Sequence, residues 1–449
     1  MYDIAVVTSA PPHLSVEVRL TTTAAESIAL SSPAPSLSAG TDVEGLIASD
    51  DRGRPLRVQP TAGGFLVAPT TGAVRFRYRL DFQNGVALSS TGSGLNAEHL
   101  YAVARGMFVA PDPASYDDAR PYPLIWVHFV TPPGWHVVTG WGVDRQVYVP
   151  SGSGALLGAT VAAAPDYRIL ADTAGGTPFV LAVRGQRHFA DSTLERVVAA
   201  SLRGAAALLG GVPVPQVTYT ADVGSKGRTS GSLQGRSSVG LMWEPGELLE
   251  RARTHDVFHE TLHLWFGGAM EADRWWTEGV TDYFAALLEA QWSGRPADLA
   301  DLCYQSLRNY RRIVRDTSIT MAEEQRENVL GDNTTLLVYR KGMLAGLLLD
   351  AAVRRATEGE ATLADVARRL LAIARLSPSR LVDDDEIRDA AVEVGGEAAG
   401  RVWRRVVAGT SPITEGEVTE ALRAVTGLPV TGPAPVAKEQ KVLIGHPKP

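Results

Sequence analysis

The chain has 449 residues, of which 45% are hydrophobic and 21% are charged, and its formal net charge is −7. This length predicts two or three domains, and the composition is that of a globular protein with a sizeable core. The sequence contains no apolar run of about 18 residues and no Lys/Arg cluster, so we expect neither a membrane span nor a nucleic-acid partner.

The cysteine content and the N-terminal residues indicate where in the cell the protein is expected to be located. Cys303 is the only cysteine, so no intrachain disulfide is possible, and its helical segment predicts a position in the core. The first residues lack a basic segment followed by an apolar stretch, so we expect no signal peptide and a cytoplasmic location.

Residues 1–165 predict a β-sandwich-like domain. Short stretches of alternating polarity, such as 14–20 and 73–82, are separated by turn residues such as 83–85. A mixed pattern begins at residue 166, where the sequence predicts a helix at 192–211 and a strand at 215–222.

After residue 250 the hydrophobic period is helical almost throughout. The predicted helices are 250–266, 277–292, 297–315, 335–357, 362–376, 385–394, 399–408 and 415–426. Residues 358–428 predict a helical domain, in which the acidic residues 383–386 form a solvated first turn. The Pro-rich residues 429–449 predict an extended tail. The fold class is therefore α+β and multidomain.

The stretch His259-Glu260-Thr261-Leu262-His263 has the spacing of a metal site. Residues four apart share one face of a helix, so both imidazoles can bind one zinc ion. Glu260 can reach a metal-bound water without binding the metal, which suits a general base. A chance match in a chain of this length has a probability of roughly one in a hundred, so the surrounding sequence matters.

A catalytic zinc ion needs a third protein ligand and one open position. Glu278 is the predicted third ligand, since it begins a second amphipathic helix after a Gly-rich turn. Asp282, one turn further on, is predicted to accept the outer N–H of a ligating histidine. His255 lies a turn before His259, too far along the axis for the same ion, and is predicted to pack or to form hydrogen bonds. Trp275 and Trp276 are predicted to be core residues.

These motifs resemble the gluzincin metallopeptidases. The stretch "HETLHLWFGG" is similar to a segment of the aminopeptidase-N-like enzymes. The stretches "WWTEGVTDYF" and "VYRKGMLAGLLLDAAVR", and the short linker between His263 and Glu278, are more similar to the glycyl aminopeptidase family. The resemblance covers about residues 230–357 and implies that 166–357 form a thermolysin-like catalytic domain.

The resemblance implies that one zinc ion is held by His259, His263 and Glu278, with Glu260 as the general base. It also implies that Tyr339 donates a hydrogen bond to the oxyanion of the tetrahedral intermediate. Without the resemblance, Tyr339 is a core residue of an amphipathic helix.

The sequence departs from the glycyl aminopeptidase pattern at two places. In that family a Gly-Gly-Leu-Glu strand binds the α-amine of the substrate, and here Gly231 and Gln234 are the corresponding substrate-binding residues, with Gln234 in place of Glu. Glu244 is a weaker candidate for the amine anchor. The residues after 428 are too few for a PDZ module, so no PDZ-mediated partner is expected.

The sequence thus predicts a zinc-dependent metallopeptidase that cuts peptide or protein substrates with a zinc-activated water and Glu260 as general base. Aminopeptidase-like activity is the first interpretation. An endopeptidase or other amide hydrolase, and a non-hydrolytic peptide-binding protein on the same scaffold, stay open because Gln234 replaces the amine-binding Glu.

Overall fold

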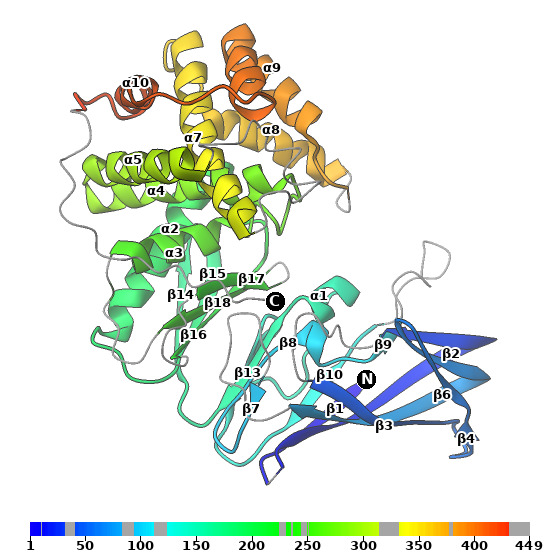
Figure 1. Cartoon of the computed structure of the whole chain (residues 1–449). Coiled ribbons are helices and arrows are strands. Elements are labelled where there is room, and N and C mark those ends of the chain that lie inside the picture. The colour runs from blue at the N-terminus through cyan, green and yellow to red at the C-terminus, as the bar shows by residue number, and fades with distance from the viewer. Residues whose placement is uncertain are drawn as a thin grey trace. The chain divides into compact units, whose positions relative to one another are not determined.

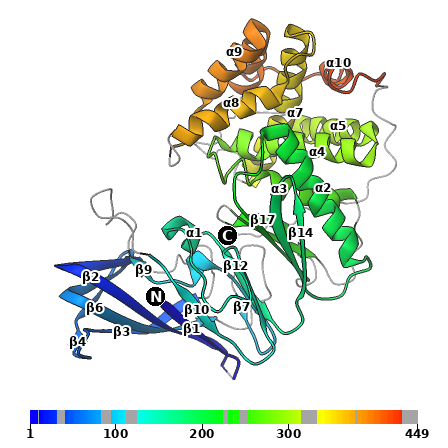
Figure 2. The ribbon, with the colours of Figure 1, turned by 180° about the vertical axis from the view of Figure 1, so that it is seen from behind.

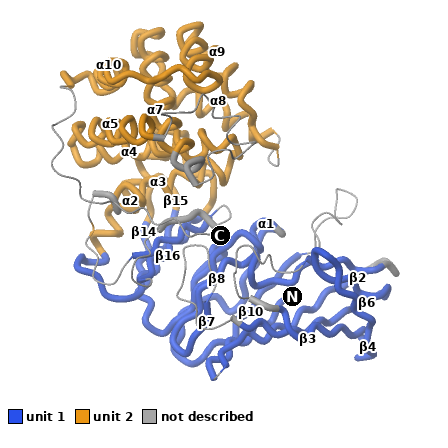
Figure 3. The backbone as a smooth tube through the Cα atoms, in the orientation of Figure 1, with its two compact units in different colours: residues 1–172, 178–191, 216–248 blue, residues 173–177, 192–215, 249–449 orange. Residues whose placement is uncertain are grey.

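The computed structural model describes residues 1–9, 11–31, 41–82, 94–111, 124–223, 230–234, 237–243, 249, 251–313, 332–376 and 380–430. The chain divides into two compact units, which Figure 3 distinguishes by colour. The first contains residues 1–172, 178–191 and 216–248, and the second contains residues 173–177, 192–215 and 249–449. The domain boundaries predicted at 165 and 357 stay predictions. The turn at 83–85 and most of the tail at 429–449 lie outside the described residues.

Two β-sheets of the first unit enclose one core. The first sheet has the order β10 (Val127–Val130), β1 (Tyr2–Val7), β2 (His13–Ser31), β6 (Gly64–Phe82), β3 (Thr41–Ser49) and β4 (Pro55–Leu56), with β5 (Val58–Thr61) beside β6 and β9 (Ala110–Pro111) beside β2. The second has the order β12 (Gly142–Val143), β11 (His136–Thr139), β13 (Thr160–Ala164), β8 (Leu100–Val103) and β7 (Gly94–Leu95). Ile4, Phe76 and Val161, from both sheets, share one hydrophobic cluster, which confirms the predicted β-rich N-terminal part.

The alternation predicted at 73–82 is present in β6. Val74, Phe76 and Leu80 are fully buried, whereas Arg75 and Arg77 are exposed. This period of two arises because successive side chains of a strand point to opposite faces of the sheet.

A third, mixed sheet follows in the chain. Its order is β14 (Arg168–Ala174), β15 (Thr177–Val183), β16 (Val217–Val223), β18 (Ser238–Trp243) and β17 (Ser230–Gln234). The strands β15, β16 and β18 are parallel, and β17 runs antiparallel to β18 at the edge. The strand predicted at 215–222 is β16, so this mixed part of the predicted fold is also confirmed.

The second unit is helical. Its elements are α2 (Asp191–Leu209), α3 (Arg251–Leu262), the π-helical turn η4 (Trp275–Val280), α4 (Thr281–Ser293), α5 (Pro296–Ile313), α7 (Asp332–Ala356), α8 (Leu363–Leu376), α9 (Asp384–Val402), the π-helical turn η5 (Trp403–Val407) and α10 (Glu415–Thr426). Helix α7 contacts η4, α4, α5, α8, α9 and α10, and its position among them can be followed in Figure 1. Cys303 is fully buried in α5, as predicted. None of the described helices is long and apolar enough to cross a membrane.

Three details of the helical prediction were wrong. Helix α3 ends at Leu262 instead of residue 266, because the chain tightens into turns before Gly267, whose φ is +107°. The predicted helices 277–292 and 399–408 each include a π-helical turn, η4 and η5 respectively, whereas the break predicted between residues 394 and 399 is present as the kink of α9 at Gly396. The acidic first turn is present, but Asp384 is not a solvated member of it, because it accepts a hydrogen bond from the buried Trp275 indole at 2.7 Å.

A buried polar network joins distant segments of the first unit. The hydroxyl of Tyr167 donates to the carboxylate of Asp222 at 2.8 Å, and the Nε2 atom of His99 lies 3.1 Å from the same hydroxyl. Burial raises the pKa of Asp222 to about 6.

This raised pKa predicts a stability that depends on pH. The unfolded carboxyl group titrates at about 3.9, so the folded state binds its proton more tightly and the wild type loses stability as the pH rises from about 4 to about 6. The stability of Asp222→Asn relative to the wild type is therefore expected to increase over this window, by about 3 kcal/mol at most, and then to level off. Urea unfolding of both proteins at several pH values measures the difference. A difference that is independent of pH would contradict the raised pKa.

Candidate metal centre

The two histidines of the predicted motif lie at the carboxyl end of α3. His259 belongs to the last turn of the helix, and His263 follows it, with its backbone N–H donating to the carbonyl of His259 at 3.3 Å. Their Nε2 atoms are only 3.0 Å apart, and both side chains are buried. The spacing of four residues therefore brings the two rings to one point, as predicted.

Helix α3 is held in place by α2. The hydroxyls of Ser201 on α2 and Thr261 on α3 are fully buried and lie 2.9 Å apart. Figure 2 shows the two helices beside each other from behind. The hydrogen bond satisfies both hydroxyls inside the core and fixes the helix that carries the histidines.

Glu278 lies on η4, the π-helical turn that precedes α4. Its Oε2 atom is 3.5 Å from the Nε2 atom of His259 and 3.5 Å from that of His263. The same oxygen is buried and has no hydrogen-bond partner. Burial raises the pKa of Glu278, but the two histidines outweigh this effect and hold it well below its usual range, so the carboxylate is ionised.

These three atoms fit the ligand positions of a zinc ion. The triangle formed by the Nε2 atoms of His259 and His263 and the Oε2 atom of Glu278 has sides of 3.0, 3.5 and 3.5 Å. Tetrahedral ligands at about 2.0 to 2.1 Å from zinc lie about 3.4 Å from one another. Two imidazoles and one carboxylate are also a donor set that catalytic zinc sites use.

The outer nitrogens of both histidines face acceptors. Nδ1 of His263 donates to the carbonyl of Phe266 at 2.8 Å, and Nδ1 of His259 lies 2.9 Å from Oδ1 of Asp282. The hydrogen bond of His263 favours the tautomer that carries its proton on Nδ1 and leaves the lone pair of Nε2 for a metal. Nδ1 of His259 lacks the geometry of a hydrogen bond, but the charge of Asp282 beside it favours the same tautomer. Asp282 therefore lies where the sequence predicted it, beside a candidate ligand.

Glu260 lies beside the two histidines. Its carboxylate and the ring nitrogens of His259 and His263 are within 4.8 Å of one another, and its Oε2 atom is buried without a hydrogen-bond partner. Burial raises the pKa of Glu260 more than the two histidines lower it. A carboxyl group whose pKa is raised accepts a proton more readily, as a general base requires.

Tyr339 reaches the same site from α7. Its ring is stacked on that of His259, with centroids 5.9 Å apart and planes inclined by 22°, and its hydroxyl interacts electrostatically with the carboxylate of Glu278. Burial and the charge of Glu278 raise the pKa of Tyr339 well above its usual value, so the hydroxyl stays a donor. Helical periodicity alone gave no sign of this position; the signal was the Tyr-x-Lys-Gly segment.

A contact between two glycines lets η4 and α7 approach so closely. A Cβ atom on Gly342 would lie 2.6 Å from the carbonyl oxygen of Trp275 and 2.9 Å from the Cα atom of Gly279. Trp275 and Trp276 are fully buried, as predicted, and Trp275 lies at this contact. The glycines of the Glu-Gly and Lys-Gly segments are thus needed where the helices that carry Glu278 and Tyr339 meet.

Gly342→Ala is therefore expected to lower the stability of the protein and to reduce activity by moving Tyr339 away from Glu278. Overpacking of this kind costs about 1 to 3 kcal/mol. Gly416→Ala is the matched control, because Gly416 lies in helix α10 with nothing within 4 Å of an added Cβ atom, so that substitution should be neutral or stabilising. Thermal unfolding of both variants measures the effect. Equal unfolding temperatures would contradict a close glycine contact.

Two charged groups near the site were not predicted from the sequence, one beside Asp282 and one beside His255. Arg340 places its Nη1 atom 3.5 Å from Oδ2 of Asp282, and Oε2 of Glu289 lies 3.6 Å from Nδ1 of His255. Neither contact could be predicted from the spacing of residues along one helix, because each joins side chains of two different helices. The predicted substrate-binding residues Gly231 and Gln234 lie on β17, in the first unit, and their side chains are outside the described part of the structure. Their role stays a prediction, and Glu244 also falls outside that part.

Comparison with known proteins gives no match to a protein-family model and none to a curated protein. Solved structures do match. An aminopeptidase N family protein from Idiomarina loihiensis is 18% identical, with a TM-score of 0.77 over 94% of this chain and 77% of its own. An M1 zinc metallopeptidase from Deinococcus radiodurans is 17% identical, with a TM-score of 0.60 over 92% of this chain and 95% of its own. Yeast LTA4 hydrolase is 14% identical, with a TM-score of 0.58 over 91% of this chain and 67% of its own. These similarities establish that the chain has the multidomain α+β fold of these proteins.

Proposed function

We propose that the protein is a zinc-dependent metallopeptidase of the gluzincin type, which hydrolyses peptide bonds. The observation that carries this proposal is the triangle of ligand atoms from His259, His263 and Glu278, with sides of 3.0 to 3.5 Å, beside Glu260 and Tyr339. The shared fold supports it, since the structures with this fold include zinc metallopeptidases. One of them, a variant of the Deinococcus radiodurans enzyme, was solved with a Tyr-Ser-Ala substrate.

The geometry of the site supports the following roles in catalysis. His259, His263 and Glu278 would hold a zinc ion, which would supply Lewis acidity to the scissile carbonyl group and to the attacking water. Glu260 takes a proton from the attacking water and returns it to the leaving amine. The hydroxyl of Tyr339 donates a hydrogen bond to the carbonyl oxygen as negative charge develops on it. Asp282 keeps the ring of His259 in its ligating orientation.

We propose that the enzyme acts as an aminopeptidase, with Gln234 in contact with the α-amine of the substrate. The amide oxygen of a glutamine can still accept a hydrogen bond from an ammonium group. A negative charge would strengthen this contact, since hydrogen bonds to charged groups contribute about 1.5 to 3 kcal/mol. Gln234 is thus expected to give a weaker preference for free N-termini than a glutamate would.

Digestion of matched peptides with free and with acetylated N-termini tests this specificity. We expect stepwise loss of the N-terminal residue from the free peptides and no cleavage of the acetylated ones. Gln234→Glu is expected to increase the preference for free N-termini about 10-fold, which corresponds to about 1.4 kcal/mol. Internal cleavage of the acetylated peptides would show an endopeptidase instead.

The alternative of a non-hydrolytic peptide-binding protein rests on Gln234 alone. Binding of a peptide requires neither a buried general base nor a hydroxyl aimed at the ligand set, and Glu260 and Tyr339 supply both. The same digestion separates the two functions. A zinc-loaded protein that binds peptides and cleaves none would be a binding protein.

A further inference from the structure

We propose that His255 is a positioning residue, which holds Asp282 against the zinc ligand His259 by donating a hydrogen bond to it. This inference rests on the proposed zinc site. It assigns a function to a histidine that the motif does not require.

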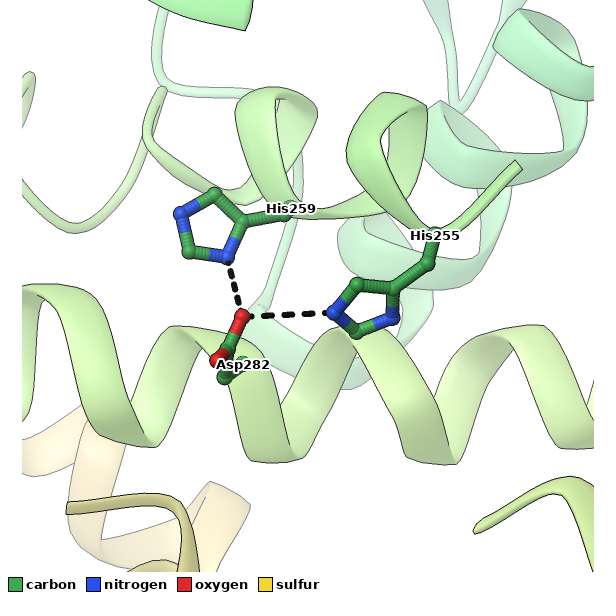
Figure 4. Close-up of side chains that lie close together, drawn as sticks. All are labelled: His255, His259 and Asp282. Atoms are coloured by element: carbon green, nitrogen blue, oxygen red, sulfur yellow. Dashed lines mark hydrogen bonds and ion pairs between the residues drawn. The ribbon is translucent and has the colours of Figure 1, made fainter. Parts of the chain in front are cut away.

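His255 lies one turn before His259 on α3. Its Nε2 atom is 3.2 Å from Oδ1 of Asp282, and the same oxygen is 2.9 Å from Nδ1 of His259. Figure 4 shows the carboxylate of Asp282 pointing between the two rings. The contact with His255 has the geometry of a hydrogen bond, so it fixes the direction in which this oxygen points.

A second carboxylate holds His255 from its other side. Oε2 of Glu289 lies 3.6 Å from Nδ1 of His255, and the side chain of Glu289 is almost fully buried. Asp282 and Glu289 are seven residues apart on α4, so they share one face of that helix and enclose the ring of His255 between them. Burial lowers the pKa of His255, but the two carboxylates outweigh it and raise the pKa to about 9. Because an ionised carboxylate only accepts, Nε2 of His255 is the donor in the hydrogen bond to Asp282.

Asp282 also contacts Arg340, through its other carboxylate oxygen. Nη1 of Arg340 lies 3.5 Å from Oδ2, whereas both histidines contact Oδ1. Without His255, the contact between Arg340 and Oδ2 would be the main one that holds the carboxylate of Asp282. Its carboxylate would then be free to rotate away from the ring of His259. As a result, the ring of His259 is expected to be less fixed in its orientation, and the affinity of the site for zinc is expected to fall.

His255, His259 and Asp282 also have the spacing of a metal-binding group of their own. A second ion at this position would need the Nδ1 lone pair of His259 while Nε2 binds the first ion. The ring of His259 would then have to lose both of its N–H protons, which is unfavourable beside an ionised Asp282. We therefore expect one zinc ion per chain.

The test compares His255→Leu with His255→Gln in the full-length protein. Zinc affinity is measured on the metal-free proteins by competition with a chromophoric chelator, separately from hydrolysis. His255→Leu removes the donor and is expected to weaken zinc binding about 10-fold, at the lower end of the loss typical for groups behind a ligand. His255→Gln keeps an N–H donor of similar reach and is expected to stay within about 3-fold of the wild type.

Val257→Ala is the control for a general loss of stability, because Val257 is fully buried on the same helix and carries no polar group. We expect this variant to unfold at a lower temperature and to bind zinc as the wild type does. His255→Leu with unchanged zinc affinity would overturn the inference, as would His255→Gln with the same loss as His255→Leu. Two zinc ions per wild-type chain would also overturn it. A wild type that binds no zinc would overturn the proposed function and this inference with it.

Discussion

Glu260→Gln is expected to abolish peptide hydrolysis while leaving zinc binding intact. Glu260 is adjacent in sequence to the ligand His259, and its buried Oε2 atom has no hydrogen-bond partner to lose. The amide cannot take a proton from water, so the contribution of the general base, about 10²- to 10⁴-fold in rate, is lost. The measurement is the rate of peptide cleavage by variant and wild type at equal zinc content.

Glu271→Gln is the matched control for this prediction, because it makes the same change at an exposed carboxylate of the second unit. Its cleavage rate is expected to equal that of the wild type. If Glu260→Gln cleaves peptides as fast as the wild type, Glu260 has no part in proton transfer.

Tyr339→Phe is expected to lower kcat about 10²- to 10³-fold with little change in KM. The reason is that the hydroxyl would stabilise negative charge on the carbonyl oxygen, which develops only in the transition state. The ring itself would remain stacked on His259, so zinc binding should be retained. Steady-state kinetics on one peptide measures both constants.

Tyr304→Phe is the control for the loss of a hydroxyl elsewhere in the helical unit, since Tyr304 hydrogen-bonds with Thr419 at 2.7 Å, outside the site. Its kcat should match that of the wild type. An undiminished kcat in Tyr339→Phe would return Tyr339 to the role of a core residue.

The candidate ligands could be predicted from the sequence because their geometry is local. His259 and His263 are placed by the period of one helix, and Glu278 follows after a turn that contains Gly267. Such short-range relations follow from the pattern of residue types. The alternating strands and most of the helices of the second unit were predictable for the same reason.

The features that were missed depend on contacts between elements distant in the chain. No local pattern shows that Gly279 meets Gly342, or that Arg340 reaches Asp282 across a helix interface. The π-helical turn that presents Glu278 was predicted as ordinary helix, because its residues have the same periodicity over so short a segment. His255 was predicted only to pack or to form a hydrogen bond, and its partners Asp282 and Glu289 became evident from the packing of α3 on α4.

The central claim is that this chain is a zinc peptidase, and digestion of a peptide mixture by the full-length protein tests it most directly. We expect products that appear with the zinc-loaded protein, disappear when zinc is removed by a chelator and return when zinc is added back. The termini of the products would show whether attack begins at the free N-terminus. A protein that binds one zinc ion per chain and cleaves no peptide in the mixture would contradict the account.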